Sequence, residues 1–120
     1  MRLLNIILFF LLILSINCIA QNDINWKTVY SFRGSSNENT DDFVIKNDKW
    51  RIVWKANKQY EEVYGGNVII KLIDSNGQQE MVANTIPNDS GKTIIRKSGK
   101  YYFEIISVIA KWQIEVQIEE

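Results

Sequence analysis

The chain has 120 residues, of which 46% are hydrophobic, 12% aromatic and 23% charged. Its 14 basic side chains balance its 14 acidic ones, and there is no histidine. Because affinity for nucleic acid comes largely from neutralising phosphates, this balance without a basic cluster argues against a nucleic-acid partner.

The first twenty residues have the pattern of an export signal. Arg2 precedes an apolar stretch that reaches Ile16, and the segment ends in the small-x-small sequence Cys18-Ile19-Ala20. This is typical of a secretory signal peptide and is short for a membrane span. We predict cleavage after Ala20, a single domain over residues 21–120, and a secreted or periplasmic location.

Lipidation of Cys18, as in bacterial lipoproteins, is the alternative, and an uncleaved anchor is a third possibility. Ser15 and Asn17 suit a lipobox poorly, because a small residue normally precedes the cysteine and a leucine lies further back. We therefore expect membrane attachment only if Cys18 is lipid-anchored to the cell envelope. Cleavage after Ala20 removes the one cysteine, so packing without disulfides must stabilise the remaining domain.

Beyond residue 21 the apolar residues recur at every second position, with Gly, Asn, Asp and Ser clustered between the runs. This period indicates strands, and no segment has a convincing helical period. The pair Asn76-Gly77 predicts a hairpin between the fourth and fifth strands, and residues 87–91 are expected to form a loop. The eight expected strands cover residues 26–32, 42–46, 50–56, 67–73, 79–84, 92–96, 100–108 and 111–118.

Eight short, evenly spaced strands favour an all-β fold, an antiparallel β-sandwich rather than a small barrel. In the last strand Trp112 and Ile114 alternate with Gln113 and Glu115, so one face is expected in the core and the other in solvent. The strand at 67–73 carries apolar residues on both faces, which predicts a central position in its sheet.

Trp50 and Trp54 share a strand face with Ile52, because side chains alternate along a strand. Ile52 is expected to point inward, so both indoles are predicted to belong to the core rather than to a binding platform. The same interpretation covers the other strand aromatics, Trp26, Tyr30, Phe32 and Trp112.

Residues 21–120 lack the side chains of the common catalytic sites. Without His or Cys, neither a Ser-His-Asp triad nor a Cys-His pair can form, and the nitrogen and sulfur ligands of zinc are missing. The segments Ser90-Gly91-Lys92 and Ser98-Gly99-Lys100 each combine Ser with Lys, but at expected turns, where both are ordinary solvated residues. We expect no catalytic residues, no metal site and no cofactor, and hence a protein that is not an enzyme.

Two loops are candidate binding sites. The segment from Asn37 to Asp42 offers oxygen ligands of the kind that Ca²⁺ uses, but lacks the spacing of an EF-hand, so an ordinary polar loop is the alternative. In the segment KQYEEVYGGN, residues 58–67, two tyrosines flank an acidic pair and two glycines permit a sharp turn. Aromatic residues in loops favour recognition, although packing over the end of the sandwich is also open. The predicted contact residues are Tyr60, Glu61, Glu62 and Tyr64.

Several motifs resemble a group of small exported bacterial domains that are often described as lipoproteins or hypothetical proteins. The matching residues are Phe32-x-Gly34, Thr40-x-x-Phe43-x-Ile45, Trp50-x-Ile52-x-Trp54, Gly99-x-Tyr101-Tyr102-x-Glu104-Ile105 and Trp112-x-Ile114-x-Val116. The resemblance implies a β-sandwich and export, and it implies no activity. Ser35-Ser36 departs from the group, where more glycine is expected.

Together these features predict a non-catalytic binding or interaction module with an unknown protein or glycan partner at the cell envelope. The alternative is a structural or accessory envelope component that pairs through an open sheet edge. Exposed Tyr60 and Tyr64 beside a groove would favour the first function, and a long unpaired edge strand the second.

Overall fold

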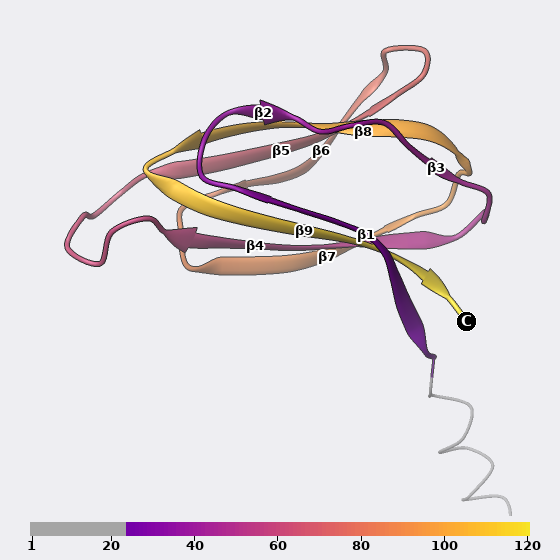
Figure 1. Ribbon diagram of the computed structural model, residues 1–120, viewed down its shortest axis with the longest axis horizontal. Helices are drawn as coiled ribbons and strands as arrows, with labels where there is room; N and C mark the ends of the chain where they lie inside the picture. Colours follow the sequence, from indigo (N-terminus) through magenta and orange to yellow (C-terminus); the bar gives the residue numbers. More distant parts are fainter. Residues whose placement is uncertain (1–23) are drawn as a thin grey trace, which may run out of the picture.

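The computed structural model describes residues 24–120, which form two packed antiparallel sheets (Figure 1) and confirm the predicted β-sandwich. These residues contain no helix long and apolar enough to cross a membrane. The strands are β1 (Trp26–Gly34), β2 (Glu38–Asn39), β3 (Phe43–Ile45), β4 (Trp50–Lys58), β5 (Asn67–Asp74), β6 (Gln79–Thr85), β7 (Asp89–Ile95), β8 (Gly99–Val108) and β9 (Ala110–Glu119).

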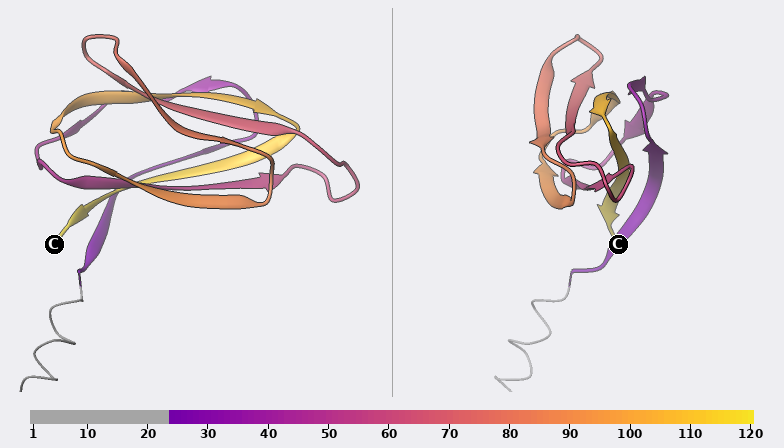
Figure 2. Two further views of the ribbon diagram at one scale, coloured as in Figure 1. Left: turned by 180° about the vertical axis from the view of Figure 1, so that it is seen from behind. Right: turned by 90° about the vertical axis from the view of Figure 1, so that its left-hand side faces the viewer.

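The two sheets form separate layers (Figure 2). One sheet has the strand order β1-β9-β4-β7, and the other has the order β2-β8-β5-β6, with β3 also paired to β8. β1 and β7 are therefore the edges of the first sheet, and β6 is an edge of the second. The central position predicted for the strand at 67–73 is confirmed, because β5 lies between β8 and β6.

The core lies between the inner faces of the two sheets. Trp50 and Trp54 are 0% and 8% exposed, which confirms that both belong to it. Trp112 and Ile114 of β9 are also buried, as the alternation predicts. Aromatic rings from both sheets meet at the centre, where the ring centroids of Phe43 on β3 and Trp50 on β4 are 5.9 Å apart.

Two core tryptophans lie over glycines of the neighbouring edge strand. Trp54 of β4 is paired with Gly91 of β7, and a Cβ atom on Gly91 would come within 2.5 Å of the indole. Trp112 of β9 is paired with Gly34 of β1 in the same way, again at 2.5 Å. The absent side chains leave room for the rings at both edges of the sheet.

The position predicted for Trp26 is wrong. The pairing of β1 with β9 shifts between Thr28 and Tyr30, so that Val29 forms a bulge. A bulge adds one residue and reverses the alternation beyond it. Trp26 therefore lies on the outer face, where the guanidinium of Arg51 is 4.4 Å from its ring centroid.

Residues 24–120 form nine strands rather than the eight predicted, and the strand expected at 92–96 begins three residues earlier. The expected loop at 37–42 contains the short β2. Next to β2, the Thr40 amide donates a 2.9 Å hydrogen bond to the Phe103 carbonyl, and the Thr40 hydroxyl accepts one of 2.9 Å from the Phe103 amide. β7 begins at Asp89, inside the expected loop at 87–91, because Asp89, Ser90 and Gly91 continue the pairing with β4. The Asn76-Gly77 hairpin is confirmed, with Gly77 at φ 80°.

Candidate functional site

The loop between β4 and β5 holds the predicted contact residues. Tyr60 is 59% exposed and Tyr64 is 87% exposed, and the intervening Glu61 and Glu62 are exposed as well. The Val63 amide donates a hydrogen bond of 3.3 Å to the Tyr60 carbonyl, which closes a turn. The tyrosines therefore do not pack into the end of the sandwich.

Gly66 fixes this loop against the hairpin that joins β8 to β9. Its φ of +87° favours glycine, and a Cβ atom there would come within 2.6 Å of the Val108 carbonyl oxygen and 3.0 Å of that of Ile109. The same atom would lie 3.3 Å from the ring of Pro87. Three separate connections of the chain thus meet at Gly66.

The connection between β6 and β7 joins the same end through Asn88. Its amide donates a 2.7 Å hydrogen bond to the Ala56 carbonyl, and its side-chain oxygen accepts a 3.2 Å hydrogen bond from the Lys58 amide. Asn88 has a φ of +70°, a conformation that Asn tolerates better than most residues. These bonds place the neighbouring Ile86, which is exposed, close to the end of β4.

The β8–β9 hairpin contributes a strained residue. Ile109 has a φ of +52°, although a β-branched side chain is disfavoured there. The Ser107 hydroxyl donates a 2.8 Å hydrogen bond to the Ala110 carbonyl, which holds the turn closed. Both Val108 and Ile109 remain exposed.

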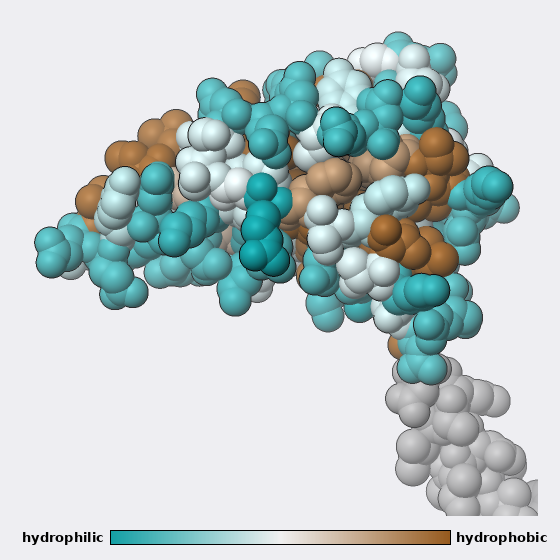
Figure 3. Space-filling view, viewed as in Figure 1, coloured by the Kyte–Doolittle hydropathy of each residue, from teal (hydrophilic) through white to brown (hydrophobic). Residues whose placement is uncertain are grey.

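We call this surface the apolar end. It brings together most of the large exposed hydrophobic residues of the part of the chain that the structure describes, and Figure 3 shows hydrophobic surface at the left-hand end of the molecule, where the β8–β9 hairpin lies. Single exposed hydrophobic residues are common, but a group on one face often marks an interaction site. The apolar end consists of Tyr60, Tyr64, Ile86, Val108 and Ile109.

Charged groups surround the apolar end on the side of the β4–β5 loop. The ammonium of Lys58 lies 4.9 Å from the centroid of the Tyr64 ring, in a cation–π arrangement. Glu61 and Glu62 form none of the ion pairs found within residues 24–120, which join Lys49 to Glu119, Lys71 to Glu104 and Lys100 to Asp42. Both carboxylates are thus available to a partner.

The sequence identified only part of this surface. It singled out Tyr60 and Tyr64 but not Ile86, Val108 or Ile109. The available signal was an apolar pair at the tip of a hairpin, Val108-Ile109, where turn-forming polar residues are usual.

The loop from Asn37 to Asp42 is tied to the second sheet. The side-chain oxygen of Asn37 accepts a 2.8 Å hydrogen bond from the Ser107 amide, and Asp42 lies 3.5 Å from the Lys100 ammonium. In residues 24–120 no three His, Cys, Asp or Glu side chains are grouped so that they could hold a metal ion.

The sequence matches no known family model and no curated protein. Among solved structures it is similar to part of a structure of infectious bursal disease virus, Gx strain, with 12% identity over 80% of this chain and 33% of that chain, and a TM-score of 0.35. It is also similar to part of the Clostridium thermocellum endo-1,4-β-D-xylanase 10B CBM22-1–GH10 modules complexed with xylohexaose. That match has 7% identity over 82% of this chain and 24% of that chain, and a TM-score of 0.38. The chain spans a third or less of the length of these proteins.

Proposed function

We propose that the protein is an exported, non-catalytic binding module that contacts a partner protein through the apolar end. The observation that supports this most directly is the meeting of three connections at Gly66, with exposed hydrophobic side chains on each of them. Rigid scaffolds commonly present binding residues on loops clustered at one end.

The composition of the apolar end favours a protein over a glycan partner. Ile86, Val108 and Ile109 are aliphatic, and aliphatic side chains contribute apolar burial without the flat face on which a sugar ring stacks. Tyr60 and Tyr64 add large contact area at low conformational-entropy cost. Glu61 and Glu62 lie at the rim, where charges affect the rate of association more than affinity.

A double variant, Tyr60→Ser with Tyr64→Ser, tests the proposal. Because both rings are exposed, we expect the melting temperature to stay within a few degrees of the wild type, while capture of the partner from the envelope fraction of the source cells is lost. The control is Val44→Ser with Met81→Ser, which removes two exposed hydrophobic residues elsewhere and should leave capture unchanged. Unfolding of the Tyr60/Tyr64 variant, or capture at full strength, would refute the role of the loop.

A further inference from the structure

The edge strands of the sandwich differ in how far they could pair with another strand. β1 carries the bulge at Val29. β6 carries a bulge at Val82, because the successive residues Ile70 and Lys71 of β5 pair with Ala83 and Met81. Bulges and very short strands are devices that block pairing at an edge, and β2 and β3 have two and three residues. β7 has neither device, because its seven residues pair one-to-one with β4.

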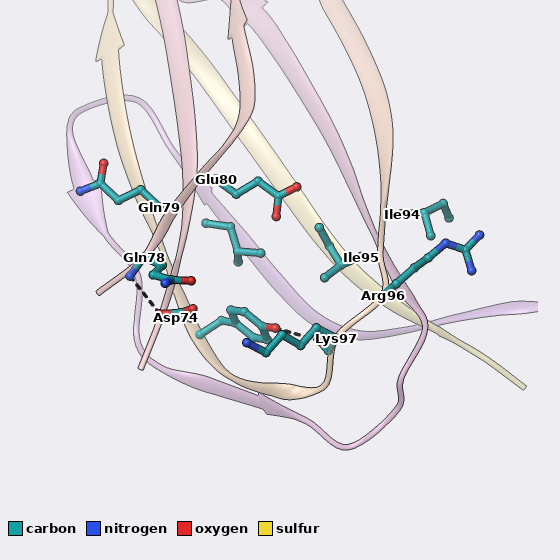
Figure 4. A pocket seen from close by; sticks show the side chains of 10 residues that line it. Asp74, Gln78, Gln79, Glu80, Ile94, Ile95, Arg96 and Lys97 are labelled. Carbon is teal, nitrogen blue, oxygen red and sulfur yellow. Dashed lines mark hydrogen bonds between the residues drawn. The ribbon is translucent and has the colours of Figure 1, made fainter. Parts of the chain in front are cut away.

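The outer edge of β7 does not pair with the second sheet. The second sheet contacts it at the start of the strand, where the Thr85 hydroxyl of β6 donates a hydrogen bond to the Asp89 carboxylate. β6 and β7 belong to different sheets, and a groove of about 540 Å³ separates their ends. Figure 4 shows Glu80 on one side of this groove and Ile94, Ile95 and Arg96 on the other. The backbone groups of β7 that point away from β4 therefore have no partner strand within residues 24–120.

The charges along β7 are complementary to those of a second, antiparallel β7. Asp89 lies at the start of the strand, and Arg96 and Lys97 follow its end. None of the three belongs to an ion pair within residues 24–120. Antiparallel pairing of two copies brings the acidic end of each strand to the basic end of the other, whereas parallel pairing would put like charges together.

We propose that β7 pairs antiparallel with β7 of a second copy, with Thr93 on the two-fold axis. Paired residues in an antiparallel sheet share a face, whereas neighbouring residues of one strand face opposite sides. In a symmetric pair of β7 strands, one residue must therefore pair with itself across the axis, and no peptide bond can lie there. With Lys92 on the axis, two ammonium groups would oppose each other. With Thr93 on the axis, Lys92 opposes the exposed Ile94 and the two threonines form a favourable cross-strand pair. Asp89 then lies level with Lys97, which follows the end of the other copy's β7.

This dimer goes beyond the proposed function, because its contact does not use the apolar end. The same strand from both copies forms it, as in most symmetric dimers. Antiparallel pairing directs the two apolar ends away from each other, so each remains accessible to a partner. The dimer would be a device for presenting two binding surfaces.

Disulfide trapping tests both the dimer and its register. The test uses the full chain with Cys18→Ser, which removes the one natural cysteine. In this chain Thr93→Cys puts the cysteines of two copies opposite each other, within the Cα separation that a disulfide requires. We expect a covalent dimer after mild oxidation. Lys92→Cys, the matched control one residue away, should remain monomeric on a non-reducing gel, whereas Lys92→Cys combined with Ile94→Cys should cross-link.

Charge exchange gives a second measurement that needs no cysteine. Lys97→Glu brings a second carboxylate close to Asp89 of the other copy, and should shift the mass measured by light scattering from dimer to monomer. Adding Asp89→Lys to the same chain restores opposite charges and should restore the dimer. Lys55→Glu, at an exposed position away from the edge, should change neither the mass nor the melting temperature. A wild type that is monomeric at all concentrations, or a Lys92→Cys chain that cross-links while the Thr93→Cys chain does not, would overturn the proposal.

Discussion

Ile109 is held in a backbone conformation that costs an L residue with a branched side chain roughly 1–2 kcal/mol. Its φ is +52°, and its side chain is exposed at the apolar end, so burial does not explain why this residue occupies the turn. Strained residues of this kind cluster at functional sites. The position therefore links backbone strain to the proposed contact.

Replacing Ile109 by Gly should raise the free energy of unfolding by about 1 kcal/mol, because glycine adopts this φ without strain. Urea unfolding monitored by tryptophan fluorescence measures the change. The matched control is Val108→Gly at the end of β8, which should lower stability, since glycine loses more backbone freedom on folding and relieves no strain there. Equal destabilisation by both substitutions would mean that Ile109 is not strained.

Trp50 and Trp26 provide a second comparison at the scale of single residues. Trp50 is fully buried and its Nε1 donates a 3.0 Å hydrogen bond to the Lys97 carbonyl, whereas Trp26 lies on the outer face against Arg51. Trp50→Ala should cost about 3–5 kcal/mol. Trp26→Ala should cost about 1 kcal/mol, the scale of an exposed cation–π contact. Similar losses in chemical denaturation would contradict the bulge-reversed face of β1.

At the scale of elements, the connection between β7 and β8 is fixed by one carbonyl. The Lys97 oxygen accepts hydrogen bonds from Trp50 Nε1 at 3.0 Å and from the Tyr101 hydroxyl at 2.7 Å, so both sheets hold this segment. Burial, followed by the negative charges of Asp74 and Glu80, raises the pKa of Tyr101 above its ordinary value. The protonated phenol that donates to Lys97 is thereby favoured.

The raised pKa of Tyr101 predicts a loss of stability at alkaline pH. Above about pH 10 an unfolded tyrosine releases its proton while the folded one retains it, so the folded state binds more protons and the free energy of unfolding falls as pH rises. Urea unfolding at a series of alkaline pH values should show this decline, and Tyr101→Phe should reduce its slope. An unchanged slope in the variant would assign the decline to other groups.

The sequence predicted most elements because alternation is a local signal. It succeeded for β4 and β9, where inner and outer residues differ clearly, and for the Asn76-Gly77 turn. It also succeeded for β5, whose apolar residues on both faces indicated a central strand. It failed at Trp26, because a single bulged residue reverses the alternation and leaves no mark in composition. It also missed the start of β7, since Asp89, Ser90 and Gly91 are turn-forming types whose strand pairing depends on Trp54 lying over Gly91.

The candidate site was harder to predict than the strands. Tyr60 and Tyr64 lie in one sequence segment and could be recognised together, and both are exposed. Ile86 and Ile109 lie in other connections, and only the close approach of Gly66 to Val108, Ile109 and Pro87 brings them to the same end. A surface assembled from distant segments requires the tertiary structure.

At the scale of the whole molecule, the export predicted from residues 1–20, which lie outside the residues that the structure describes, would determine which partners the domain can meet. The pattern of residues 1–20 predicts a secreted chain that starts at Gln21. Intact mass spectrometry of the protein recovered from its source cells should give the mass of residues 21–120, with or without cyclisation of Gln21 to pyroglutamate. A diacylglyceryl modification on Cys18 would contradict this and assign the protein to a membrane surface.

Site-specific photo-cross-linking tests whether the apolar end is the binding surface. A benzophenone side chain at position 64, on the apolar end, is compared in intact cells with the same group at position 44, an exposed site on β3. We predict that position 64 yields one discrete protein adduct, which disappears when Ile86→Ser and Ile109→Gly are added, while position 44 yields none. Equal adducts from both positions, or no adduct from position 64, would show that the apolar end is not the binding surface.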